Sequence, residues 1–108
     1  MIDAYVTWLE RSNWTVRREV HFVDVYAERK TKLYAEAKGR TTPPGLDVDT
    51  LYGQLLRRMK DPEPGARYAV VVPTAALNAA LRVPAWVRDR LSVDVYQIDD
   101  DAEVHLRR

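Results

Sequence analysis

The stretch TVRREVHFVDVYAERKTKLYAEAK, residues 15–38, decides the fold that we expect for this chain. Along it, β-branched and aromatic residues alternate with polar ones, which is typical of antiparallel strands with one face toward a core. A charged run at residues 28–32 interrupts the alternation and predicts a turn. The stretch therefore predicts three consecutive antiparallel strands.

The apolar residues of the last two strands determine how these strands pair. They must lie on one core face, because a slip of one residue would turn one set into water. The two sets are Val23, Val25 and Ala27 on one strand and Leu33, Ala35 and Ala37 on the other. With a three-residue loop at 29–31, this register pairs Tyr26 with Tyr34 and places Asp24 opposite Glu36.

Two opposed carboxylates are an unusual feature of a sheet face. Residues directly across an antiparallel pair have Cβ atoms about 4.5–5.5 Å apart, and like charges there are destabilising unless a cation intervenes. Lys38 lies two residues beyond Glu36 on the same face, roughly 6.5 Å along the strand. Oxygen ligands without histidine or cysteine favour Mg²⁺ or Mn²⁺. The same residues would also fit an ordinary solvated face of a hairpin.

Helices are expected before and after these strands. Apolar residues at helical spacing predict an amphipathic helix over residues 2–11. Prolines and a glycine in the stretch 39–47 predict a loop. Asp49 is a candidate cap for a second helix with the apolar stripe Leu51, Leu55 and Met59, and Pro62 ends it.

The second half of the chain predicts further strands and helices. Residues 68–72 are apolar without alternation, which favours a central strand buried on both faces. Thr74 is expected to cap a helix over 75–81, and Pro84 to begin another that ends at Leu91. Residues 93–98 alternate like a strand, and residues 103–106 are expected to form an edge strand.

Composition limits the classes of function. The chain has 108 residues, of which 46% are hydrophobic and 31% charged, so we expect one globular domain over residues 1–108. The absence of cysteine excludes disulfides, zinc–thiolate sites and cysteine nucleophiles. No apolar run reaches the ~20 residues that span a bilayer, and no export signal is evident, so a cytoplasmic protein without a membrane partner is expected.

With these elements in order, the segments Val23-Asp24 and Glu36-Ala37-Lys38-Gly39 resemble the PD-(D/E)XK nuclease superfamily, which has the restriction-endonuclease-like fold. The resemblance extends over nearly the whole chain as an order of elements, whereas the motif itself is only a few residues. It implies an α/β fold with an α-β-β-β-α-β-α-β core, in which helices flank a mixed central sheet. Val23 stands where the motif name has proline.

The resemblance also implies roles for the residues at matching positions. Asp24, Glu36 and the backbone carbonyl of Ala37 would bind Mg²⁺ or Mn²⁺, and Lys38 would orient or activate the attacking water. Gln54 matches a glutamine that several branches of the superfamily carry on the helix after the lysine strand, although a surface position would also explain it.

Further residues are weaker candidates for the same site. Glu10 loosely matches an extra acidic metal ligand on the first helix of junction resolvases, and exposed glutamates are also routine on such helices. Arg40 with Arg57 or Arg58 could hold neighbouring phosphates of a nucleic acid.

Other chemistry has little support. We expect His21 to be a partly buried strand residue and His105 an exposed one, because neither has a partnered serine or cysteine motif. The glycines have no phosphate-loop spacing. Trp8, Trp14 and Trp86 could stack on bases, but we expect at least two of them to be structural.

Two hypotheses of function follow from these residues. In the first, the chain is a Mg²⁺-dependent endonuclease, a hydrolase that cleaves phosphodiester bonds in DNA. In the second, it is a catalytically idle nuclease-like fold that serves as a DNA-binding, protein-interaction or regulatory module. A generic α/β domain with a charged hairpin is a third alternative. The small size and the net charge of +1 predict a homodimer or a subunit of a larger assembly, because one copy offers little surface to grip DNA.

Overall fold

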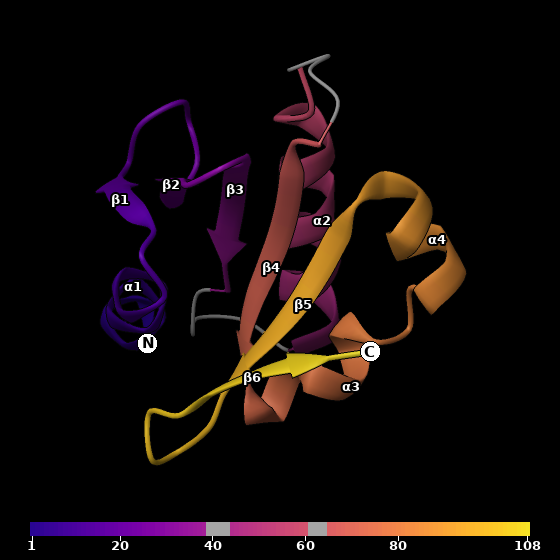
Figure 1. Cartoon of the computed structure of the whole chain (residues 1–108). Helices are drawn as coiled ribbons and strands as arrows, with labels where there is room; N and C mark the ends of the chain where they lie inside the picture. The colour runs from indigo at the N-terminus through magenta and orange to yellow at the C-terminus, as the bar shows by residue number, and fades with distance from the viewer. Residues whose placement is uncertain (39–43, 61–64) are drawn as a thin grey trace.

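The structure, a computed structural model, describes residues 1–38, 44–60 and 65–108, except for the side chains of residues 44–46. Within these residues a mixed sheet of six strands runs in the order β1-β2-β3-β4-β5-β6 (Figure 1). The strands are β1 (Thr15–Arg18), β2 (Val25–Glu28), β3 (Lys32–Ala37), β4 (Arg67–Pro73), β5 (Val93–Ile98) and β6 (Val104–Arg107). Strands β3, β4 and β5 are parallel, and the other neighbouring pairs are antiparallel. The predicted α/β class is confirmed.

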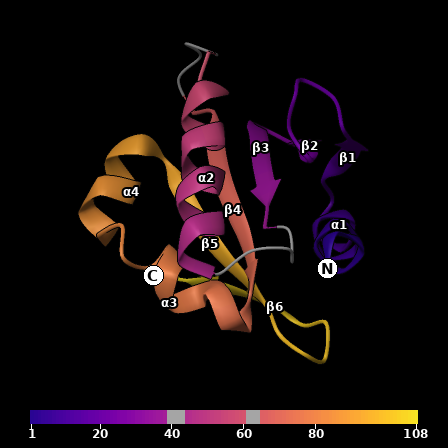
Figure 2. The same cartoon turned by 180° about the vertical axis from the view of Figure 1, so that it is seen from behind.

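Helices cover both faces of this sheet. The helical segments are α1 (Ile2–Arg11), α2 (Pro44–Arg57), the 3₁₀ helix η1 (Thr74–Ala76), α3 (Leu77–Ala80) and α4 (Ala85–Leu91). Helix α1 packs through Tyr5, Val6 and Leu9 on one face. On the other face, α2 packs through Val48 and other apolar residues, together with η1 and α3. Figure 2 shows α2 in front of the sheet on that second face, running alongside β4.

The predicted hairpin register is confirmed. Strand β2 pairs with β3 so that Tyr26 is opposite Tyr34, and Val25 is opposite Ala35. The loop between them has three residues, as expected, because β2 ends at Glu28 and β3 begins at Lys32. Asp24 lies directly before β2. The last pair of the ladder is Val25 with Ala35, so the next position of the same register sets Asp24 against Glu36.

The two faces of the hairpin differ from the prediction in two respects. The face that carries Glu36 is not wet, because helix α2 covers it, and Tyr26 and Tyr34 on that face are buried. Val23 packs on the α2 side of the sheet, whereas Val25 packs on the α1 side. The two residues differ because the chain turns before β2, where Phe22 has a positive φ of 63°. Alternation correctly placed the strand residues but could not extend through this turn.

Helix α2 begins earlier than the sequence predicts. It starts at Pro44, whereas we expected a loop through residue 47 and a cap at Asp49. Proline and glycine do not forbid the first turn of a helix, because the N–H groups there have no intrahelical partner and the φ of proline is already helical. As a result Asp47 belongs to the first turn of α2.

Two further local predictions are wrong. Thr74 does not cap a helix through its side chain: its hydroxyl accepts a hydrogen bond from Gln97 Nε2 at 2.8 Å, and a 3₁₀ turn precedes the short α3. His21 is exposed and lies in the turn before β2, not within a strand. Trp8 and Trp14 pack against the core, as expected, whereas Trp86 is 65% exposed.

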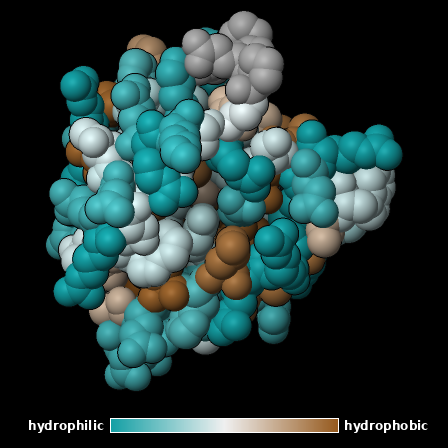
Figure 3. All heavy atoms as spheres, viewed as in Figure 1, coloured by the Kyte–Doolittle hydropathy of each residue, from teal (hydrophilic) through white to brown (hydrophobic). Residues whose placement is uncertain are grey.

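The surface is mixed in character. The side seen in Figure 1 is mostly hydrophilic, with small hydrophobic areas between (Figure 3). None of the helices in the described residues has the length and apolar character that crossing a membrane requires.

Candidate functional site

Asp24 and Glu36 meet at the C-terminal end of β3. The Asp24 carboxylate accepts a hydrogen bond from the backbone N–H of Ala37, with 2.8 Å between Oδ2 and N. This bond ties the residue before β2 to the end of the neighbouring strand. The two carboxylates that the register predicted to be opposed are therefore held together by the backbone of the hairpin.

Glu36 is an acid in an unfavourable environment. The residue is 6% exposed. Burial, followed by the charge of Asp24 and a hydrogen bond with Asp24, raises the pKa of Glu36 from its ordinary value of 4.5 to about 7, although Arg58 opposes the rise. Glu36 therefore binds a proton near neutral pH unless a cation takes the place of that proton.

Lys38 follows Glu36 on the same face and is buried in an ion pair. Its ammonium lies 2.7 Å from Oδ2 of Asp47, and both side chains are largely hidden from solvent. The backbone N–H of Lys38 donates to the carbonyl of Val71, so β4 fixes the end of β3. A buried lysine held in this way has a defined position, since its charge is compensated by a carboxylate on α2.

Helix α2 brings a row of polar residues toward these strands. Asp47 and Gln54 are seven residues apart on α2, so they lie along one side of the helix axis, and Arg58 directly follows the end of the helix. The first of them contacts Lys38, and the last lies with its Nε 3.8 Å from Glu36 Oε1. Gln54, which is half-buried, stands between them on this side. The structure thus brings the predicted Gln54 to the face of α2 that the charged residues occupy.

The other predicted residues are less closely associated. Arg57 is exposed at the end of α2. Glu10 is exposed on α1, and in the described residues no hydrogen bond or ion pair joins its side chain to Asp24 or Glu36. Arg40 lies outside the described residues.

Asp47 is the residue that the sequence did not identify. Its position falls within the predicted loop, because prolines and glycine usually interrupt regular structure. The available signal was an aspartate within one turn after a proline, which is a common start of a helix. Recognising it would have placed a carboxylate opposite the end of β3.

A second group of metal-ligand residues lies far from this pair in the sequence. Carboxylate oxygens of Asp99 and Glu103 and a ring nitrogen of His105 lie within 4.8 Å of one another at the β5–β6 hairpin. His105 Nε2 is 2.7 Å from Asp99 Oδ2, and Asp99 Oδ1 accepts from the N–H groups of Asp101 and Glu103 at 2.9 Å each. These contacts account for the group as the closure of a turn.

Comparison with known proteins supports the fold. No protein-family model matches the chain, and no curated protein matches it in sequence. Among solved structures it resembles two proteins that share its mixed α/β fold. One is an FdxN element excision controlling factor protein from Anabaena variabilis, with 16% identity, a TM-score of 0.61, and coverage of 95% of this chain and 93% of that one. Another is an XisH family protein from Nostoc punctiforme, with 15% identity, a TM-score of 0.58, and coverage of 93% and 92%. At this identity the likeness establishes a shared fold.

Proposed function

We propose that this protein is a Mg²⁺-dependent nuclease that hydrolyses phosphodiester bonds in DNA. The observation that carries the proposal is the contact of Asp24 with the buried Glu36, where the pKa of Glu36 rises to about 7. Carboxyl groups with a strongly raised pKa occur more often at functional sites than on ordinary sheet faces, because a purely structural role does not require two carboxylates to lie close together. The A. variabilis neighbour, which shares the fold, is named an FdxN element excision controlling factor protein.

The side chains present fit a divalent cation. Asp24 and Glu36 would hold it through oxygen atoms, with the Ala37 carbonyl as the family resemblance implies, and the positive charge would relieve their repulsion. When bound, Mg²⁺ would lower the pKa of a coordinated water and neutralise charge that develops on the phosphate.

The chain's own residues would supply positioning around the phosphate. Lys38 would donate hydrogen bonds to a phosphate oxygen or to the attacking water, and Asp47 would hold the ammonium in place. Gln54 lies along the same side of α2 and would help to orient that water. Hydrolysis then forms one bond from the water oxygen to phosphorus and breaks the bond to the departing sugar oxygen, which takes up a proton.

A second candidate is a nuclease-like module that regulates or binds without cutting. A specific observation favours it: two charges of the site already have partners, Lys38 with Asp47 on α2 and Glu36 with Arg58, which directly follows α2. Such internal compensation would let the fold keep these residues for stability alone.

Incubation of supercoiled and branched DNA with the purified protein in Mg²⁺ distinguishes the nuclease from the module that does not cut. We expect the protein to cleave DNA and EDTA to stop the cleavage. Asp24→Asn and Lys38→Met should each abolish cleavage, and circular dichroism should show that both variants are folded. Calorimetry with Mn²⁺ is the companion measurement. Failure to bind Mn²⁺, even with an oligonucleotide present, would favour the regulatory module, and cleavage that survives both substitutions would refute the assignment of these residues.

A further inference from the structure

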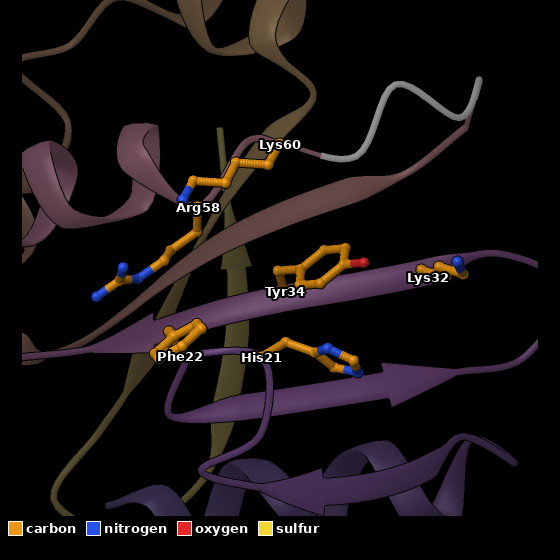
Figure 4. A pocket seen from close by; sticks show the side chains of 6 residues that line it. All are labelled: His21, Phe22, Lys32, Tyr34, Arg58 and Lys60. Atoms are coloured by element: carbon orange, nitrogen blue, oxygen red, sulfur yellow. The ribbon is translucent and has the colours of Figure 1, made fainter.

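A basic groove of about 380 Å³ adjoins the carboxylate pair. The described residues that line it are His21, Phe22, Lys32, Tyr34, Arg58 and Lys60 (Figure 4). They come from the turn before β2, from β3 and from the end of α2. Three of them are cations at neutral pH, and none of these six carries a carboxylate. A groove of this composition favours an anionic ligand.

Phe22 is the unusual member of the groove. Its side chain is 83% exposed, although transfer of a phenylalanine ring out of water is strongly favourable. Its backbone is also unfavourable, because Phe22 and His21 have φ values of 63° and 53°, which side chains larger than glycine rarely adopt. An exposed ring on a strained turn indicates a contact surface.

Arg58 connects the groove to the carboxylate pair. Its guanidinium lies 5.6 Å from the centre of the Phe22 ring, and its Nε lies 3.8 Å from Glu36 Oε1. Figure 4 shows the Arg58 side chain extending from the end of α2 toward Phe22, with Tyr34 of β3 beside them. A chain of phosphates held in the groove would thus reach the pair at the end of β3.

We infer that the groove holds an unpaired nucleotide next to the bond that is cut, with its base stacked on Phe22 and its phosphates on Arg58, Lys60 and Lys32. A ring can stack on a base only where the face of that base is free, which is not the case inside a continuous duplex. The substrate class is therefore DNA with a single-stranded segment, such as a fork, flap or junction. This inference rests on the proposed function for the bond that is cut, but strand binding by the groove can be measured without it.

The test measures binding in EDTA, where no cleavage occurs. Fluorescence anisotropy compares a labelled thymidine oligonucleotide with a blunt duplex of equal length. We expect the single strand to bind more tightly than the duplex. Phe22→Ala should weaken single-strand binding roughly five- to 150-fold, the usual range for one stacked base. Phe22→Trp should retain binding. Lys60→Ala should reduce the slope of log affinity against log salt by about 0.7, the value for one phosphate contact on a single strand.

The chain offers a matched control in Trp86. It is also an exposed ring beneath an arginine, with Arg90 5.7 Å from its centre, but it lies on α4 and outside the groove. Trp86→Ala should leave binding unchanged. Because Phe22 is exposed, its substitution should not disturb folding, which the melting temperature checks.

The outcomes separate the two proposals. Strand binding that depends on Phe22, without cleavage in Mg²⁺, would keep the groove and refute the nuclease. Cleavage that requires Asp24 but is unaffected by Phe22→Ala would keep the nuclease and overturn the groove. Equal affinity for duplex and single strand, or an equal loss in Trp86→Ala, would also overturn it. The groove would also be overturned if Phe22→Ala changed the oligomeric state, measured by analytical ultracentrifugation, and left DNA binding unchanged. Phe22 would then contact a second copy of the chain.

Discussion

Two groups of carboxylates in this protein have the same residue types and opposite electrostatics. At the end of β3, Asp24 and Glu36 are held together, and burial and mutual repulsion raise the pKa of Glu36 to about 7. At the β5–β6 hairpin, a hydrogen bond with His105 and backbone N–H groups hold the pKa of Asp99 below its ordinary range. The first group is destabilised by its surroundings and the second is satisfied by them. Closeness of ligand atoms therefore does not by itself distinguish a binding site from a turn.

The largest effect should come from removing one charge of the buried pair. We expect Asp24→Asn to lower Mn²⁺ affinity by at least about 100-fold, because even an outer partner of a metal ligand contributes 10- to 100-fold. Isothermal titration calorimetry measures this. The matched variant is Asp99→Asn at the hairpin, which should leave Mn²⁺ binding unchanged. A larger loss in Asp99→Asn than in Asp24→Asn would reverse the roles of the two groups.

The second effect concerns stability and its dependence on pH. The pKa of Glu36 is about 7 in the folded protein and 4.5 ordinarily, so protonation of this group favours folding. That stability is fully present below pH 4.5 and is lost as the pH rises through about 7. Glu36→Gln cannot ionise, and at pH 8 in EDTA it should exceed the parent in free energy of unfolding by about 1–3 kcal/mol.

Urea denaturation at pH 5 and pH 8 tests this expectation. The gain of Glu36→Gln should shrink toward zero as the pH approaches 4.5, the ordinary pKa of the group. Glu10→Gln is the control, because Glu10 is exposed on α1, and it should show no such trend. A Glu36→Gln variant that is less stable than the parent at pH 8 would mean that Arg58 compensates the charge fully.

The β2–β3 hairpin shows how much of the Asp24–Glu36 pair could be predicted from the sequence. Strand alternation and a three-residue loop were enough to determine the register that brings Asp24 to Glu36, because both are local properties. The burial of Glu36 was not predictable in the same way, since it depends on where α2 packs. Asp47 does not follow from the sequence, because two prolines and a glycine predict a loop where α2 begins. The roles of these residues stay predictions.

The third effect is a coupling between metal and protons at the buried pair. A cation must displace the proton that Glu36 binds, so Mn²⁺ affinity should rise with pH, by up to about tenfold per unit, until the pKa near 7 is passed. Calorimetry in two buffers of different ionisation enthalpy counts the protons released. Glu36→Gln should lose this dependence together with most of the affinity. Binding that is equally strong at pH 6 and pH 8 would show that Glu36 is not protonated in the free protein.

The smallest effect should be at the hairpin, and it should be local. Asp99 Oδ1 accepts hydrogen bonds from the N–H groups of Asp101 and Glu103, so Asp99→Ala should speed the hydrogen exchange of these two amides roughly fivefold, the equivalent of one ordinary hydrogen bond. NMR exchange measurements resolve the two amides, and Asp24→Asn should leave their rates unchanged. If Asp99→Ala instead altered Mn²⁺ binding while the amide rates stayed the same, the hairpin group would be a ligand site. Because the exchange rates and the metal affinity are measured on the same variants, they decide independently whether each group of carboxylates closes a turn or binds a cation.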